Sequence, residues 1–331
     1  MIEIKKLFIC NSNMFIPMVL SEILQHAQYR YIVMSDIKNI HSFFEYISIP
    51  NVIFIPYGVN FVKDGKLSFI KKKKEAMTAL KPYHIEELVF FHAEFGDMGN
   101  WLIYKLSKKI PVKYCKLYNK IPSQKAKISL KSIMMNIKLY VLWGQIMDIR
   151  DAGHLFPSLP VSFFKKVNAE TVDIDVNLEV INSFLSDKFK EYNLSSKYLL
   201  LTGTAVQNHW YGEKEYANFI NKLIETIGKD KMVSKCHPRY DGLYGLEKEL
   251  QQVPSFIPGN LLLNHYDIYV GIESTLLVEA AQAGKKAVSI IDWLESDKER
   301  VKGQHDFFDS RLEGKGKIYY PTNMEEFMGI K

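Results

Sequence analysis

The sequence predicts an α/β fold of two Rossmann-like domains whose sheets are mainly parallel. The length of 331 residues favours two domains over one. Short apolar runs alternate with segments of helical period through both halves, which is typical of doubly wound sheets. A mixed polar stretch, Val161–Lys197, separates the halves. We therefore place the domains at residues 1–190 and 191–331, facing each other so that their strand ends line a shared cleft.

In the first half, strand-length apolar runs alternate with segments of helical period. The helical period is clearest at Phe15–Gln28 and Lys71–Leu80. A longer amphipathic segment, Ser129–Met147, predicts a further helix and is followed by a stretch rich in glycine and proline. The predicted strands are Lys6–Cys10, Tyr31–Met34, Val52–Pro56, Leu88–His92 and Val112–Leu117.

The second half repeats this alternation. Helical segments are predicted at Lys214–Ile227, Leu243–Gln251 and Ser274–Ala283, the last one closed by Gly284. The strands between them are predicted at Tyr198–Thr202, Met232–Cys236, Tyr266–Gly271 and Lys286–Ile291.

Cysteine use and hydropathy bear on where the protein works. Cys10, Cys115 and Cys236 are widely spaced and show no metal-ligand pattern, so we expect no disulfide framework, no zinc site and a reducing cytoplasm. The N-terminus shows no apolar signal-peptide core. The longest apolar stretch, Ile133–Met147, is shorter than the ~20 residues that span a bilayer. We expect a cytoplasmic protein without a transmembrane helix.

Positive charge is concentrated in the first half. The formal net charge is +6, and ten lysines but no acidic residue lie between Met98 and Met147. Lys71–Lys74 form a second cluster. Such a face attracts an anionic glycan or anionic lipid, with a merely solvated lysine-rich surface as the alternative. We expect peripheral association with the inner membrane through residues 98–147. We expect no nucleic-acid partner, because the aromatic motifs of known modules are missing.

The segment DIYVGIESTLLVEAAQAGKK combines a strand, a tight turn after Gly271 and a helix. Backbone N–H groups of the first helical turn, with hydroxyls from Ser274 or Thr275, could bind a phosphate or carboxylate. Glu279 lies about one turn further on, where it could accept hydrogen bonds from ribose hydroxyls. The structural alternatives are that Ser274 is only an N-cap and Glu279 only a surface residue.

A second segment, KCHPR, places several basic groups at one strand end. Lys235 and Arg239 could neutralise a nucleotide, while His237 could bind its phosphate beside the turn opened by Pro238. Consecutive βα loops of one sheet share an edge, so this segment and the Ser274 turn should lie near each other.

Two weaker segments could contribute to the same edge. In LLLTGT, Thr202, Gly203 and Thr204 could admit a phosphate or sugar, although the spacing of ATP and dinucleotide motifs is absent. The turn at Pro258 and Gly259 could frame a nucleotide base.

Carboxylates in the first half offer a base for the chemistry. In VFFHAEFGDMGNWL, Glu94 and Asp97 follow a predicted strand, where one of them could deprotonate an acceptor hydroxyl. The alternatives are that Asp97 caps a helix and Glu94 is solvated. Asp173 and Asp175 form a DxD triplet in the polar connector, where we interpret them as surface carboxylates.

The order LLLTGT, KCHPR, IPGNLLL and GIESTLLVEAAQAGKK resembles the C-terminal half of bacterial GT-B sialyltransferases, which include lipooligosaccharide sialyltransferases and polysialyltransferases. The resemblance covers Tyr198 to Ile291. It implies a CMP-sugar donor, with His237 stabilising the departing CMP and with Ser274 and Thr275 binding phosphate or the sialic acid carboxylate. It implies neither a metal nor a cofactor.

The sequence departs from this family at two places. The family's acidic-acidic-glycine motif is replaced by Tyr118-Asn119-Lys120, and Glu273 stands directly before Ser274. A carboxylate beside an anion site is unfavourable unless it is protonated or turned away. We expect an inverting, metal-independent transfer of sialic acid to lipooligosaccharide or capsule. The alternatives are a CMP-Kdo or UDP-sugar donor, and an inactive nucleotide- or glycan-binding homologue.

Overall fold

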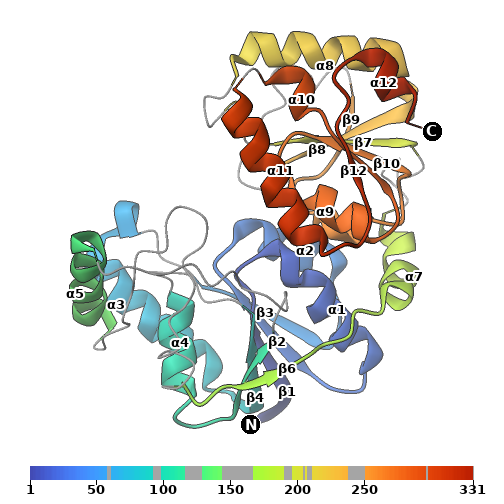
Figure 1. The fold of residues 1–331 in the computed structure, drawn as a ribbon. Coiled ribbons are helices and arrows are strands. Elements are labelled where there is room, and N and C mark those ends of the chain that lie inside the picture. The colour runs from blue at the N-terminus through green and yellow to red at the C-terminus, as the bar shows by residue number, and fades with distance from the viewer. Residues whose placement is uncertain are drawn as a thin grey trace. The chain divides into compact units, whose positions relative to one another are not determined.

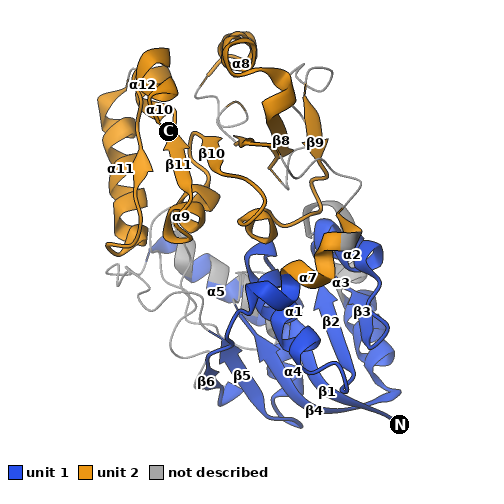
Figure 2. Cartoon of the chain, turned by 90° about the vertical axis from the view of Figure 1, so that its right-hand side faces the viewer, with its two compact units in different colours: residues 1–181 blue, residues 182–331 orange. Residues whose placement is uncertain are grey.

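The computed structural model divides the chain into two compact units, residues 1–181 and 182–331 (Figure 2). Each unit has its own sheet and its own core. The structure describes residues 1–57, 61–91, 98–115, 129–143, 167–189, 196–203, 206, 211–237, 250–295 and 297–330.

The first unit is a six-stranded parallel sheet in the order β3-β2-β1-β4-β5-β6 (Figure 1). The chain runs outward from β1 on one side and returns to pair β4 with β1 on the other. This is the strand order of a Rossmann sheet. The strands are β1 (Ile2–Ile9), β2 (Tyr31–Ser35), β3 (Val52–Pro56), β4 (Tyr83–Phe90), β5 (Val112–Cys115) and β6 (Glu170–Val172). The helices are η1 (Asn13–Phe15), α1 (Ile16–Gln25), α2 (Lys38–Ile47), α3 (Phe61–Leu80), α4 (Met98–Leu106), α5 (Leu130–Trp143) and α7 (Leu178–Lys188), which crosses into the second unit.

Apolar side chains cover both faces of this sheet. Leu7 and Ile9 join a cluster that includes buried residues of α3 and α4. Phe8 points to the opposite face because side chains alternate along a strand. There its ring stacks near those of Tyr31 and Phe91, with centroids 6.0 and 6.2 Å away. Burial on both faces explains why every residue of β2 is buried.

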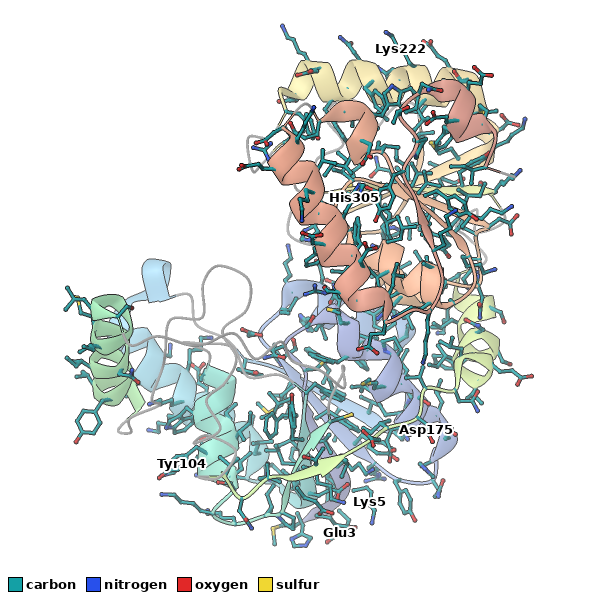
Figure 3. All side chains as sticks on the ribbon, viewed as in Figure 1. Glu3, Lys5, Tyr104, Asp175, Lys222 and His305 are labelled. Carbon is teal, nitrogen blue, oxygen red and sulfur yellow. The ribbon has the colours of Figure 1, made fainter. Side chains whose placement is uncertain are left out.

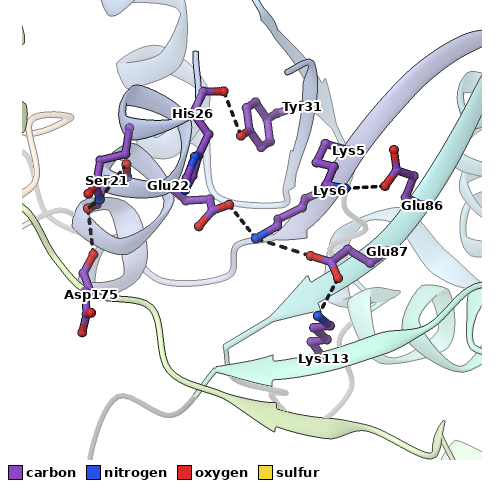
Figure 4. A network of polar contacts seen from close by, with 11 residues as sticks. Lys5, Lys6, Ser21, Glu22, His26, Tyr31, Glu86, Glu87, Lys113 and Asp175 are labelled. Carbon is purple, nitrogen blue, oxygen red and sulfur yellow. Dashed lines mark hydrogen bonds and ion pairs between the residues drawn. The ribbon is translucent and has the colours of Figure 1, made fainter. Parts of the chain in front are cut away.

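A line of alternating charges connects α1, β1, β4 and β5 (Figure 4). The Lys6 ammonium lies 2.5 Å from Glu22 and 3.4 Å from Glu87, and Lys113 lies 2.8 Å from Glu87. The hydrogen bond to Glu87 raises the pKa of Lys113. These charges compensate one another, so the network contributes to the fold of the first unit.

The DxD triplet has a structural place in the first unit. Asp173 and Asp175 are both exposed. The Ser21 hydroxyl of α1 donates to the carbonyl of Asp175 over 2.8 Å and accepts from the backbone N–H of Asn177 over 2.8 Å (Figure 4). These bonds fix the segment after β6 against α1. Among the described residues, no group of three His, Cys, Asp or Glu side chains could hold a metal ion.

The second unit repeats the first with a six-stranded parallel sheet in the order β12-β11-β10-β7-β8-β9. Its strands are β7 (Tyr198–Thr202), β8 (Met232–Cys236), β9 (Gln251–Val253), β10 (Ile268–Gly271), β11 (Lys286–Ser289) and β12 (Ile318–Tyr319). Its helices are α8 (Glu213–Ile227), η2 (Lys229–Lys231), η4 (Gly259–Leu262), α9 (Thr275–Gln282), α10 (Ile291–Leu294), α11 (Lys298–Leu312) and α12 (Met324–Met328).

Helices α8 and α9 lie on opposite sides of this sheet (Figure 1). The face covered by α8 is built around Leu200, Met232 and Val270, with Ile220 and Leu223 of the helix packed in the same cluster. Helices on opposite faces of a buried parallel sheet make the second unit a doubly wound domain.

The predicted α/β fold with two Rossmann-like domains is confirmed. The strands Val52–Pro56, Tyr198–Thr202 and Met232–Cys236 have the predicted bounds. Several predicted boundaries were wrong: α3 begins at Phe61 and not at Lys71, Ile291 begins α10 and does not end a strand, and Gln251 begins β9 and does not end a helix. Residues 243–249 of that last predicted helix lie outside the described residues. Within the described part of the chain, no helix combines the length and apolar character needed to cross a membrane.

Two glycines before β12 allow a matched test of packing. Gly314 and Gly316 both have positive φ, at 77° and 80°. A Cβ on Gly314 would meet nothing within 4 Å, whereas one on Gly316 would overlap the backbone carbonyl group of Ala281 in α9. We expect Gly314→Ala to cost about 1 kcal/mol of unfolding free energy from backbone strain alone. Gly316→Ala should cost at least about 2 kcal/mol more, because the backbone it meets cannot move aside.

Urea denaturation of the two variants measures this difference. Equal losses would show that the segment before β12 does not press on α9.

Candidate functional site

The reversal of strand order in the second sheet defines one edge of interest. The chain leaves β7 toward β8 on one side and pairs β10 with the other side of β7. In open α/β sheets, such a reversal marks the crevice at the carboxyl ends of the strands where ligands bind. Thr202 ends β7 and Gly271 ends β10, so both predicted residues are at this crevice.

The turn after β10 leads directly into α9. Ser274 is the N-cap, and its hydroxyl accepts from the N–H of Leu276 over 3.3 Å. Thr275 is the first residue of the helix. The structural role expected of Ser274 is thus observed. The start of α9 also presents N–H groups and the positive end of the helix dipole toward the crevice edge.

Glu273 connects the two loops at the crevice. A Cβ on Gly203 would lie 3.5 Å from both Cγ and Oε1 of Glu273, so this side chain runs alongside the loop after β7. The glycine thus accommodates a carboxylate of the same chain. Sequence reasoning noted Glu273 only as a departure from the family, and nothing in the local pattern indicated that it reaches Gly203.

Lys235 is the most unusual group at this edge. It lies on β8 between Leu201 of β7 and Val253 of β9, which are both buried. Lys235 itself is only 4% exposed, and its Nζ has no hydrogen-bond partner within the described part of the chain. Burial lowers the pKa of this amine from 10.5 to about 8. An unpaired ammonium in apolar surroundings is costly, and a bound anion would offset that cost.

Neighbouring groups hold β8 in place beside β7. The buried Thr202 hydroxyl donates to the carbonyl of Lys235 over 3.3 Å. Thr202 therefore holds the strand and is not directed at a ligand. His237 directly follows β8 and is partly buried. The KCHPR segment thus places a cation and an imidazole at the same strand end.

Glu279 lies one turn into α9 and is partly accessible. Burial of its carboxyl group raises the pKa to about 7. At neutral pH this group is therefore divided between its acid and carboxylate forms, and it can donate as well as accept a hydrogen bond.

The remaining glycines at this edge serve the packing. A Cβ on Gly259 would lie 2.7 Å from Cδ2 of Leu276, so a side chain here would require Leu276 of α9 to move. Pro258 precedes η4 as its N-cap residue. A Cβ on Gly271 would lie 3.2 Å from Cβ of Leu201. At Gly259 and Gly271 the lack of a side chain lets the backbone pack closely against neighbouring residues at this edge.

Several predicted residues lie outside the described residues. They are Glu94, Asp97, Thr204, Pro238 and Arg239. Residues 92–97 follow β4, which pairs with β1 at the strand-order reversal of the first sheet.

Tyr211 is a further residue that sequence reasoning missed. Its hydroxyl is buried without a partner among the described residues. Burial raises its pKa, and the nearby carboxylates of Glu295 and Glu273 raise it further. Glu295 in turn accepts from Arg300 over 2.7 Å. Glu273 therefore lies among polar groups drawn from distant segments, which no local motif could indicate.

A second cluster lies at the ends of β11 and β12. The Nε2 atom of His305, labelled in Figure 3, is 2.6 Å from Oδ1 of Asp292. Its ring stacks on Tyr320, with centroids 3.8 Å apart. An aspartate in this position fixes the tautomer of the imidazole. The three residues come from α11, α10 and the end of β12, so only the tertiary fold unites them.

No protein-family model matches the sequence, and no curated protein sequence matches it. Solved structures do match. The UDP-GlcNAc 2-epimerase from Methanocaldococcus jannaschii is 13% identical, with a TM-score of 0.48 over 99% of this chain and 91% of the epimerase. The enzyme of that name from Neisseria meningitidis, bound to UDP-GlcNAc, is 12% identical, with a TM-score of 0.45 over 93% and 90% of the two chains.

The spinosyn rhamnosyltransferase SpnG, complexed with thymidine diphosphate, is also 12% identical. Its TM-score is 0.44 over 94% of this chain and 91% of the transferase. Each of these is a similarity of backbone shape at low sequence identity.

The buried amine of Lys235 can be tested through its effect on the free energy of unfolding. The pKa of Lys235 is about 8 in the folded chain and 10.5 ordinarily. We expect Lys235→Met to be more stable than the wild type by about 3 kcal/mol at pH 7. Between pH 8 and 10.5 the unfolded wild type binds more protons than the folded one, so wild-type stability rises and the advantage of the variant disappears. Denaturation of both proteins at several pH values measures this change in the stability difference.

Lys222→Met is the matched control, because Lys222 is exposed on α8 (Figure 3). If the stability difference between Lys235→Met and the wild type did not change with pH, the burial of an unpaired amine at Lys235 would be contradicted.

Proposed function

We propose that this chain is a glycosyltransferase that takes its sugar from a CMP-activated donor, with sialic acid as the first choice. The acceptor is a bacterial surface glycan, either lipooligosaccharide or capsule. The transfer inverts the anomeric centre and requires no metal or cofactor. The donor site is the edge formed by the loops after β7, β8 and β10.

The observation that carries this proposal is the unpartnered amine of Lys235. The leaving group of a CMP-sugar is a phosphate, and an ammonium without a counter-charge is a suitable partner for it. His237 directly follows the end of β8, and the N-terminus of α9 adds N–H donors. The interactions of these groups with the phosphate strengthen as negative charge develops on the leaving oxygen. Catalysis requires such preferential binding of the transition state.

The proposed chemistry is a single displacement. A carboxylate, from Glu94 or Asp97, removes the proton of the acceptor hydroxyl. That oxygen bonds to the anomeric carbon as the bond from the carbon to the phosphate oxygen breaks. The electron pair of the broken bond stays on CMP, where Lys235, His237 and Arg239 stabilise the charge. Ser274 and Thr275 bind the phosphate or the sugar carboxylate, and Glu279 accepts from ribose hydroxyls.

Glu273 favours a second candidate, a donor whose sugar carries no carboxylate. Its side chain lies at Gly203, where it would repel an acidic sugar but could accept hydrogen bonds from neutral hydroxyls. A UDP-sugar meets this condition, whereas CMP-Kdo shares the acidic group of sialic acid. An inactive homologue would bind the nucleotide without turning it over.

Calorimetric titration with CMP, CDP, UMP and UDP tests the donor class. We expect the wild type to select CMP, and His237→Ala to lose at least about tenfold in affinity because a phosphate contact is removed. Lys235→Met should lose affinity as well, while the exposed Lys222→Met should bind as the wild type does. A preference for a diphosphate would remove the CMP-sugar assignment, and a preference for UDP in particular would favour a UDP-sugar donor. Absence of binding would overturn the proposal.

Replacing the Glu273 carboxylate, which lies beside Gly203, distinguishes the two donor candidates. We expect Glu273→Gln to bind CMP-sialic acid several-fold more tightly than the wild type, because a like charge is lost from the anion site. The gain should shrink at high salt. The control ligand is CMP alone, which lacks the sugar carboxylate. A loss of affinity for the intact donor would indicate that Glu273 accepts hydrogen bonds from it.

A further inference from the structure

The helix α5 exposes a continuous apolar stripe. Its members are between 46% and 75% exposed and account for six of the twelve exposed large hydrophobic residues among those described. In Figure 3 the drawn side chains of α5 project outward from the helix. The stripe consists of Leu130, Ile133, Met134, Ile137, Tyr140 and Val141.

The spacing places these side chains on one face. They recur at intervals of three and four residues, which brings them one above another along a helix. Single exposed apolar residues are ordinary on a protein surface, but a contiguous stripe marks an interaction site. The stripe therefore needs an apolar partner.

We propose that α5 is a membrane-binding helix that lies in the interface of an anionic bilayer, with this stripe in the acyl region. With 14 residues it is about 21 Å long, too short to cross a hydrocarbon core of about 30 Å. A helix of this length with one apolar face lies parallel to the membrane surface.

Charge decides between a bilayer and a second copy of the chain. The segment from Met98 to Met147, which contains α5, carries ten lysines and no acidic residue. A second copy docked on the stripe would bring the same positive charge against itself, which is unfavourable. An anionic lipid surface is complementary to this charge, and two of the ten lysines, Lys131 and Lys138, belong to the helix itself.

Vesicle sedimentation with the full chain tests the proposal. We expect the wild type to bind vesicles of phosphatidylcholine mixed with phosphatidylglycerol, and to bind phosphatidylcholine alone far more weakly. Added salt should weaken the binding. The double variant Ile137→Ser/Val141→Ser should lose at least about tenfold in partitioning, because two side chains no longer enter the acyl region. Both positions are exposed, so the melting temperature should not change.

Met134→Ser and Met328→Ser form a matched pair. Both methionines are exposed, at 65% and 43%, but Met328 lies on α12 in the second unit. Met134→Ser should weaken vesicle binding and Met328→Ser should not. A fluorophore placed by Ile137→Cys should shift to the blue on insertion, and labelling is selective because the three native cysteines are buried.

Three results would overturn the inference. They are a wild type that ignores anionic vesicles, stripe variants that bind as the wild type does, and a dimer that the stripe variants dissociate without any effect on vesicles. The last result would assign the face to a second copy. The proposal does not rest on the glycosyltransferase assignment, which the nucleotide titrations test separately.

Discussion

The position of β7 between β8 and β10 is the constraint on which the candidate site depends. Because these three strands are parallel, they end at one edge, and the hydrogen-bonded register sets which residues meet there. Leu201 of β7 pairs with Lys235 of β8, and Val270 of β10 pairs with Leu200. The three strand ends of the candidate site are thus neighbours although they are far apart in sequence. No local motif is required to bring them together, and a one-residue slip of β8 would turn Lys235 to the other face.

The same edge concentrates groups that disfavour the folded state without a ligand. Lys235 is buried without a counter-charge, and burial raises the pKa of Glu279. Natural cores rarely keep such groups unless they serve a purpose, since apolar replacements would be more stable. Their presence together is the reason to interpret this edge as functional, and they explain why stability and binding should respond oppositely when Lys235 is replaced.

Sequence reasoning was most accurate for short strands with clear ends. β3, β7 and β8 were located at their bounds because each is a short apolar run ended by a polar residue, proline or glycine. α11 was missed because only Phe308 and Leu312 are buried, which leaves no apolar period. β12 has two residues and no signal of its own. In the site, the basic groups at the end of β8 were predicted, but the burial of Lys235 and the approach of Glu273 to Gly203 are tertiary facts that spacing cannot supply.

The two proposals concern different units, and this separation has a physical consequence. α5 belongs to the first unit and the Lys235 edge to the second, each with its own sheet and core. Exposed side chains of α5 contribute little to packing, so replacing them cannot disturb the second core through lost contacts. Effects of distant, independent substitutions add. If vesicle binding nevertheless changed nucleotide affinity, the coupling would have to pass between units through a change in their arrangement, and the chain would then be a transferase whose membrane surface regulates its donor site.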